Sequence, residues 1–154
     1  MLYWIICKST STGDTVREYD ELGRCIEKTV PTIGTSTYTY DIIDGLKTGE
    51  EGYVAEKTVD PKNNETLKVY DKDSRLSRVT NNSKDTTYSY YDNGATKSIS
   101  RGNGSVSNYT YNNVNQLTNL TTTKNSATIE EFSYEYDLNG NMTKKIDSKG
   151  STLY

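Results

Sequence analysis

Aromatic and polar residues alternate in short stretches along the chain. In Tyr38-Thr39-Tyr40, Tyr88-Ser89-Tyr90, Tyr109-Thr110-Tyr111 and Tyr134-Glu135-Tyr136, two tyrosines stand two positions apart with a polar residue between them. A period of two places both rings on one face of a β-strand and the polar residue on the other. No apolar stripe of helical spacing persists for three turns, and Thr, Asn, Ser and Gly are weak helix formers. We therefore expect an all-β chain with essentially no helix.

The tyrosine phrase recurs six times, usually followed by Asp or Asn and then by a turn. Taking Tyr19, Tyr40, Tyr70, Tyr90, Tyr111 and Tyr136 as register marks, the steps are 21, 30, 20, 21 and 25 residues. A period near 20 residues indicates a repeat architecture. The residues to which we assign a structural role in the repeat are Tyr19, Asp20, Gly23, Arg24, Tyr38, Tyr40, Asp41, Tyr70, Asp71, Arg75, Tyr88, Tyr90, Asp92, Gly94, Tyr109, Tyr111, Asn112, Tyr134, Tyr136, Asp137 and Gly140.

The residues after each tyrosine strand have turn chemistry. In the segments that begin at Asp20 and Asp137, the carboxylate can accept from the backbone two residues on, and a glycine at the fourth position tolerates positive φ. In the segment that begins at Asn112, Asn replaces both residues, since Asn also adopts positive φ more readily than most. A return strand follows each turn, at 24–30, 76–80, 95–99, 117–121 and 142–146.

The apolar residues of two return strands stand three apart, at Leu76/Val79 and Leu117/Leu120. This spacing breaks strict alternation and predicts a bulge or strong local twist. A second polar turn follows each return strand, so each repeat is one hairpin. Successive hairpins then join into an antiparallel meander, which we expect to form a curved, spiralling sheet.

We divide the chain into a partial leading repeat at 1–15 and an array of about six hairpin repeats at 16–154. Two stretches fit the array poorly, an insertion at about 42–61 and the connection 121–129, and both suggest longer loops or an extended hairpin. The apolar run Leu2 to Cys7 is too short for a membrane span and lacks the flanks of a signal peptide. We interpret it as part of a strand of an earlier repeat, and no break in composition marks a second domain.

The composition favours a thin sheet over an ordinary globular core. Hydrophobic residues are only 32% of the chain, mean hydropathy is -0.84, and 14 residues are Tyr. Globular domains carry roughly 45 to 50% apolar residues, whereas disordered chains are poor in aromatics. A tyrosine ring buries a large area while its hydroxyl reaches water or a polar partner. This combination suits a sheet one layer deep.

Charge and residue content argue against several kinds of site. The net charge is -3, from 18 basic and 21 acidic residues, so no basic stripe is present for nucleic acid. With no His, we expect no zinc site, and a Ser or Cys nucleophile would have to use Lys or a carboxylate as its base. Cys7 and Cys25 could form a disulfide in an exported protein, or remain two free thiols. We predict no enzyme activity, no cofactor and no membrane insertion.

The Asp-rich turns that begin at Asp71 and Asp137 resemble the opening of a calcium loop. An EF-hand loop needs Gly at its sixth position and Glu at its twelfth. Counting from Asp71, these positions hold Leu76 and Asn82; counting from Asp137, they hold Met142 and Ser148. We therefore assign no metal site.

The phrase Tyr19-Asp20-Glu21-Leu22-Gly23-Arg24, together with Tyr-x-Tyr-Asp strands every 20 or so residues, resembles the YD repeat of Rhs proteins, bacterial wall-associated repeat proteins and animal teneurins. The resemblance runs from about Val16 to Tyr154. Only the first copy has the full Gly-Arg, and Ser74-Arg75 has the Arg alone. The resemblance implies a long β-sheet strip that spirals into a hollow shell, which in bacterial members often holds a C-terminal toxin.

Two functions remain open at this stage. The chain could be a structural segment of such a shell in a larger secreted, cell-surface or cell-wall protein, with neighbouring repeats and an enclosed toxin as partners. Alternatively, it could be a carbohydrate-binding module that recognises cell-wall or cell-surface glycans through exposed Tyr rows. Packed tyrosines favour the shell, and a solvent-facing aromatic strip favours the glycan. Because unpaired edge strands invite pairing, we also expect edge-to-edge self-association of the isolated chain.

Overall fold

The computed structural model describes residues 4–10 and 13–154, with side chains from residue 13 onward. The described residues contain strands and turns and no helix, which confirms the all-β class. For the same residues, no helix is long and apolar enough to cross a membrane. The chain divides into two compact units, 1–83 and 84–154, which are described separately below.

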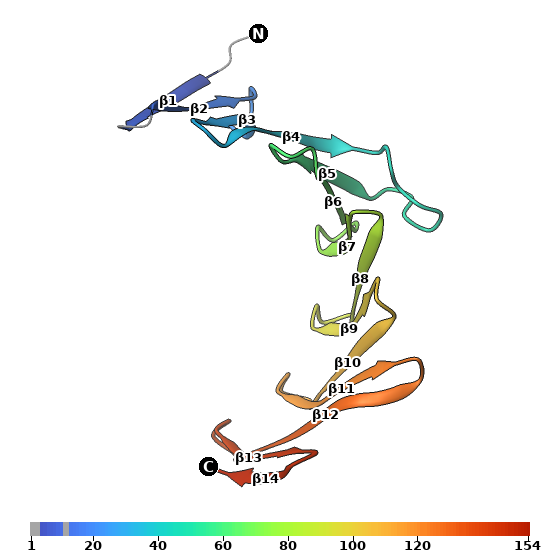
Figure 1. Cartoon of the computed structure of the whole chain (residues 1–154). Coiled ribbons are helices and arrows are strands. Elements are labelled where there is room, and N and C mark those ends of the chain that lie inside the picture. The colour runs from blue at the N-terminus through green and yellow to red at the C-terminus, as the bar shows by residue number, and fades with distance from the viewer. Residues whose placement is uncertain (1–3, 11–12) are drawn as a thin grey trace. The chain divides into compact units, whose positions relative to one another are not determined.

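The first unit is a meander in which each strand pairs antiparallel with the next (Figure 1). A loop of eleven residues, 43–53, interrupts this pattern between β4 and β5. Its strands are β1 (Trp4–Thr10), β2 (Gly13–Tyr19), β3 (Cys25–Val30), β4 (Gly34–Ile42), β5 (Val54–Val59), β6 (Glu65–Tyr70) and β7 (Leu76–Asn81).

The second unit is also an antiparallel meander. Its β11 and β12 form the extended hairpin expected at 121–129, where Lys124 lies opposite Ala127. The two turn residues, Asn125 and Ser126, have φ of 50° and 63°, which suits a two-residue hairpin turn. The strands are β8 (Lys84–Tyr90), β9 (Thr96–Arg101), β10 (Ser105–Tyr111), β11 (Leu117–Lys124), β12 (Ala127–Tyr136), β13 (Met142–Asp147) and β14 (Gly150–Leu153).

The strand register gives the sheet two chemically different faces. In the second unit, Tyr109 lies opposite Leu120, which lies opposite Phe132. Because neighbouring residues of a strand alternate between faces, the next row along belongs to the other face. That row is polar and consists of Ser89, Ser98, Asn108, Thr121 and Glu131.

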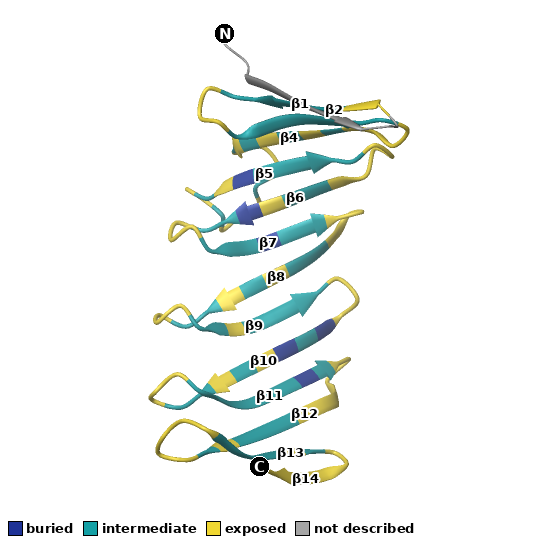
Figure 2. Ribbon diagram, turned by 90° about the vertical axis from the view of Figure 1, so that its left-hand side faces the viewer, coloured by how far each residue is buried: buried dark blue, intermediate teal, exposed yellow. Residues whose placement is uncertain are grey.

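Burial is correspondingly shallow. Among the described residues, only Ala55 and Val69 are fully buried hydrophobic residues. Most strand residues are half-buried, and the turns are exposed (Figure 2). This is the burial expected of a single layer in which Tyr is the main apolar residue.

Five of the six tyrosine strands meet their return strand at a bulge with one extra return-strand residue. Tyr19 lies opposite Cys25 and Glu18 opposite Glu27, so Ile26 is an extra residue of the return strand. The same shift occurs at Tyr70. It recurs at Tyr90, Tyr111 and Tyr136. The bulges predicted from the spacing at Leu76/Val79 and Leu117/Leu120 are therefore confirmed. A bulge adds local right-handed twist, and here it does so once in each of these hairpins.

Candidate functional site

The repeat turn is built around one carboxylate, as the copy at Asp71 shows. The Asp71 backbone N–H donates to the Arg75 carbonyl (2.9 Å), and the Ser74 N–H donates to the Asp71 carbonyl (2.9 Å). Asp71 Oδ1 accepts from the N–H groups of Asp73 (3.0 Å) and Arg75 (2.9 Å), and Oδ2 accepts from Arg75 Nε (2.9 Å). A single side chain thus binds the middle and the far end of its own turn.

The same turn closes around Asp20, Asp137 and Asn112. In the Asn112 copy, Oδ1 accepts from the N–H of Gln116 (2.9 Å), and Nδ2 donates to Gln116 Oε1 (2.7 Å). Negative charge is therefore not required for the geometry. The fourth residue of each turn is left-handed, including the non-glycine residues Ser74 (φ 61°) and Asn115 (φ 64°).

Hydrogen bonds to these carboxylates lower their pKa values. The backbone N–H of Arg24 is the main cause of the lowered pKa of Asp20, and burial opposes it. For Asp137, the side-chain amide of Asn141 is the main cause of the lowered pKa, followed by the backbone N–H of the same residue. The folded turn therefore stabilises the ionised form of its Asp.

Two copies of the repeat depart from the expected arrangement. The residue that starts the fourth turn is Tyr91, whose N–H donates to the Ala95 carbonyl (2.9 Å), while the expected Asp92 is exposed beside it. The cause is the register: Tyr90 occupies the bulge, so the next residue opens the turn. Asp41 starts no turn either. It lies within β4 at φ 55° and accepts a hydrogen bond from Arg24 Nη1.

A further copy of the turn lies at the opposite edge of the sheet, within and just beyond the sequence segment that we treated as an insertion. Asp60 Oδ1 accepts from the N–H groups of Lys62 and Asn64 (both 2.8 Å), and Oδ2 accepts from Asn64 Nδ2 (2.7 Å). Asn63 is left-handed at φ 62°. No tyrosine pair precedes this copy. The signal that could have revealed it is an Asp followed, four residues later, by a side chain that can bind the second carboxylate oxygen.

Tyrosine hydroxyls connect one hairpin to the next. Tyr40 donates its hydroxyl hydrogen to the Cys25 carbonyl (2.8 Å), and Tyr136 does the same to the Leu117 carbonyl (2.8 Å). Both carbonyls stand at the start of a return strand, two residues before its pairing with the following strand begins. The hydroxyl thus supplies the hydrogen bond that the next strand does not provide there.

The tyrosines of the repeat are half-buried. Burial raises the pKa of Tyr40, Tyr111 and Tyr134. The guanidinium of Arg24 lies 4.6 Å from the centre of the Tyr40 ring, and Tyr91 meets Tyr111 edge to face at 6.1 Å. These contacts belong to the packing between neighbouring hairpins.

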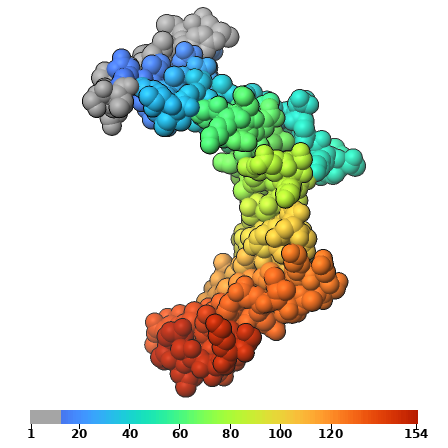
Figure 3. Space-filling view, viewed as in Figure 1, coloured from blue at the N-terminus to red at the C-terminus, as the bar shows by residue number. Residues whose placement is uncertain are grey.

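The insertion loop 43–53 lies over the row formed by Ala55, Val69 and Arg78. Figure 3 shows the loop residues as a projection from the first unit. Beneath it, Ala55 and Val69 face each other across β5 and β6, and Val69 faces Arg78 on β7. The Arg78 side chain is only 3% exposed. Its Nε and Nη2 donate to Glu50 Oε1 and Oε2 (both 2.7 Å), and Nη2 also donates to the Gly45 carbonyl (2.9 Å). The bond from Arg78 is the main cause of the lowered pKa of Glu50.

Cys25 is a free thiol. The register places Cys7 opposite Val16 and Cys25 opposite Tyr19, on two strands with β2 between them. Strands are about 4.8 Å apart, so the two Cα atoms lie farther apart than the roughly 7 Å limit for a disulfide. Of the two states left open by the sequence, the register fits free thiols.

These features define a β-hairpin repeat protein whose hairpins close with one recurrent turn and are joined by tyrosine hydroxyls. No protein-family model matches the chain, and no curated protein matches it.

Solved structures of similar fold contain TcdB2 and TccC3. The crystal structure of TcdB2-TccC3-TEV matches with a TM-score of 0.55 and 16% identity, over 94% of this chain and 10% of that chain. A Photorhabdus luminescens Tc holotoxin pore with a substituted TccC3 matches with a TM-score of 0.53 and 16% identity, again over 94% and 10%. At this identity the likeness shows the fold. The chain spans about a tenth of the length of the chains it matches.

Proposed function

We propose that the chain is a non-enzymatic structural segment of a YD-repeat β-shell, in a larger secreted or cell-surface protein of the kind that encloses and delivers a C-terminal toxin. The observation that carries this proposal is that the repeat residues hold the turns and hairpins of the sheet together. The carboxylates of Asp20, Asp71 and Asp137 hold their own turns, and the hydroxyls of Tyr40 and Tyr136 hold the neighbouring hairpin. Each of these groups is engaged in building the sheet.

Two observations support this proposal. The Tyr-Asp phrase resembles the YD repeat on its sequence, and the fold resembles a segment of TcdB2-TccC3 proteins. One of those structures is described as a Tc holotoxin pore, so a protein with a similar segment is part of a toxin. Since this chain corresponds to a tenth of such a protein, the partners we propose are neighbouring repeats of a longer chain and an enclosed toxin domain.

The alternative of a glycan module that uses Tyr rows gains no specific support. Tyr40 and Tyr136 are half-buried, and their hydroxyls are bound to backbone carbonyls. A stacking platform for sugars needs an accessible ring face, whereas these rings fill the space between hairpins. Glycan recognition through the Tyr rows therefore stays a prediction, and the packing favours the shell.

Protease protection of the full-length parent protein tests the proposal. If the chain belongs to an enclosing shell, a C-terminal segment of the parent should resist a broad-specificity protease under native conditions. The segment should be degraded once mild denaturant opens the sheet, and the same segment expressed alone should be degraded at once. A parent protein whose C-terminal segment is cut equally fast in both forms, while this sheet remains intact, would contradict enclosure.

A further inference from the structure

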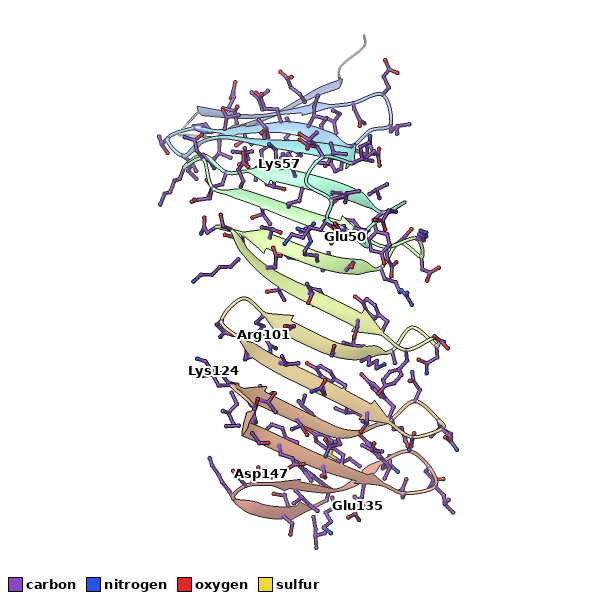
Figure 4. The ribbon with its side chains drawn as sticks, turned by 90° about the vertical axis from the view of Figure 1, so that its right-hand side faces the viewer. Glu50, Lys57, Arg101, Lys124, Glu135 and Asp147 are labelled. Carbon is purple, nitrogen blue, oxygen red and sulfur yellow. The ribbon has the colours of Figure 1, made fainter. Side chains whose placement is uncertain are left out.

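A cavity lies beside the insertion loop, on the face of the first unit opposite Tyr38. Its floor is one cross-strand row in which Thr39 faces Lys57, Lys57 faces Leu67, and Leu67 faces Thr80. The cavity has a volume of about 670 Å³. Figure 4 views this face, with Lys57 on β5 and Glu50 in the insertion. The full lining is Thr39, Ile42, Asp44, Gly45, Lys57, Glu65, Leu67, Thr80, Asn82 and Ser83.

The insertion supplies the wall of this cavity and is held firmly. Arg78 binds Glu50 and the Gly45 carbonyl from below. A Cβ on Gly45 would come within 3.1 Å of Leu67 Cδ2, and its φ of +80° also favours glycine, so the loop lies directly on the floor. In repeat proteins, insertions into one repeat often form the binding face. A loop that is fixed by a buried ion pair gives a preformed site, because a ligand does not have to order the loop when it binds.

The chemistry of the lining selects a class of ligand. Thr39, Ser83 and Asn82 offer groups that both donate and accept hydrogen bonds, around an apolar floor at Leu67, while the Thr80 hydroxyl already accepts from Arg78 Nη1 (2.6 Å). The strand backbone of the floor is already paired within the sheet, so recognition there falls to side chains. A sugar residue matches this lining, since each of its hydroxyls donates and accepts, and its ring also has an apolar face.

Charge narrows the class further. The lining contains two carboxylates, Asp44 and Glu65, and one ammonium group, Lys57, which lies 3.4 Å from Glu65. The lining therefore has a net charge of -1, which disfavours phosphates, uronic acids and other anions. Neutral and amine-bearing ligands are compatible with this charge. An extended peptide is disfavoured because the floor offers no free strand edge.

We propose that this cavity binds a neutral or amine-bearing saccharide residue, with its apolar face on Leu67 and its hydroxyls on Asp44, Lys57 and the Thr and Asn side chains. The residue could be a free sugar or the end of a glycan chain. The site does not use the Tyr rows and does not rest on the shell function.

Titration of the ¹⁵N-labelled chain, followed by amide chemical shifts, tests this site. The probes are N-acetylglucosamine, glucosamine, an N-acetylglucosamine oligosaccharide, and glucuronic acid as the anionic control. We expect saturable shifts at Asp44, Lys57, Leu67 and Thr80 with the first two sugars and none with glucuronic acid. Tighter binding of the oligosaccharide than of the monosaccharide identifies a glycan end, and equal binding identifies a free sugar.

Two matched variants locate the binding. Thr39→Phe fills the cavity from an exposed strand position and should weaken binding by at least about tenfold. Thr37→Phe places the same ring two residues away on the same face, outside the lining, and should leave binding unchanged. Dispersed amide spectra confirm that both variants fold. The proposal is overturned if the folded wild-type chain shows no saturable shifts, if Thr39→Phe binds as well as wild type, or if the shifts map to the Tyr face.

Discussion

The hydroxyl of Tyr136 donates a hydrogen bond of 2.8 Å to the backbone carbonyl of Leu117, the first residue of the preceding return strand. This carbonyl stands where the sheet begins to separate near its turn edge, because pairing between β11 and β12 starts only at Asn119. Tyr40 makes the equivalent bond to Cys25 in the first unit. In these two copies the second tyrosine thus does more than pack: it supplies the hydrogen bond missing from the ladder.

Tyr136→Phe should destabilise the second unit by about 1 kcal/mol. The substitution keeps the ring and leaves the half-buried Leu117 carbonyl without this donor, and a typical hydrogen bond contributes roughly 0.5 to 1.5 kcal/mol. Urea unfolding followed by circular dichroism measures the change. Tyr134→Phe is the control, since the Tyr134 ring stacks on Phe132 at 6.4 Å and the substitution preserves that contact. Equal stability of the two variants would show that the Tyr136 hydroxyl does not stabilise the second unit.

Asp137→Ala should open the hairpin of β12 and β13. The carboxylate accepts from the N–H groups of Asn139 and Asn141 (both 2.9 Å), and alanine leaves both donors without it. Amide hydrogen exchange across 137–147 should become several-fold faster. Asp92→Ala is the matched control, because Asp92 stands beside a turn that Tyr91 opens. We expect no change in exchange there, and a change as large as that of Asp137→Ala would contradict the assignment of the turn-opening residue.

Glu50→Gln should release the insertion loop from the sheet. Breaking a buried ion pair by neutralising one partner costs about 3 to 5 kcal/mol, and the Arg78 guanidinium would remain buried beneath the loop. Faster amide exchange in 43–53 and a lower urea midpoint are the expected results. The control, Glu51→Gln, changes an exposed neighbour whose carboxylate accepts from the Gly49 N–H and does not contact Arg78, and it should have a much smaller effect. Unchanged exchange in Glu50→Gln would show that Arg78 does not hold the loop.

Stability should fall in acid. The pKa values of Asp20, Asp60 and Asp137 are lowered in the folded chain, chiefly by hydrogen bonds from Arg24, Asn64 and Asn141 respectively. A carboxyl group with a lower pKa in the folded state binds more protons when unfolded. Its contribution is therefore present above the unfolded pKa, near 4, and is lost as pH falls through the folded value.

Asp137→Asn separates this charge effect from the geometry of the turn. The Asn112 turn shows that an amide can hold the same hydrogen bonds. The variant should keep native amide exchange at neutral pH and lose less stability than wild type between about pH 5 and pH 3. Urea midpoints of the variant and of the wild type, measured across that pH range, test this prediction. The same acid sensitivity in both proteins would show that Asp137 does not contribute to the effect.

Much of the fold could be predicted from period and spacing, because its stabilising contacts are local. The tyrosine pairs predict the strands, and the spacing of three at Leu76/Val79 predicts the bulge that the register confirms. The sequence does not fix which residue opens a turn where two adjacent residues could do so. With tyrosines at 88, 90 and 91, only the strand register shows that Tyr91 and not Asp92 opens the turn.

The burial of Arg78 could not be predicted from its sequence neighbourhood. Ser-Arg-Val-Thr resembles an ordinary polar return strand, and an isolated arginine there is expected to face water. It is buried because Glu50, 28 positions earlier, folds over the sheet to meet it. The cavity beside the insertion depends on the same long-range contact. Contacts of this kind carry no local signal, so the insertion could be located in the sequence while the surface that it builds could not.

Electron cryomicroscopy of the parent protein tests the central claim most directly. We predict that residues 4–10 and 13–154 form part of one uninterrupted sheet, with further hairpins paired to the outer edges of β1 and β14 and the sheet enclosing a C-terminal segment. A map in which this chain forms a separate domain would contradict the account, if both edge strands are unpaired and no polypeptide is enclosed.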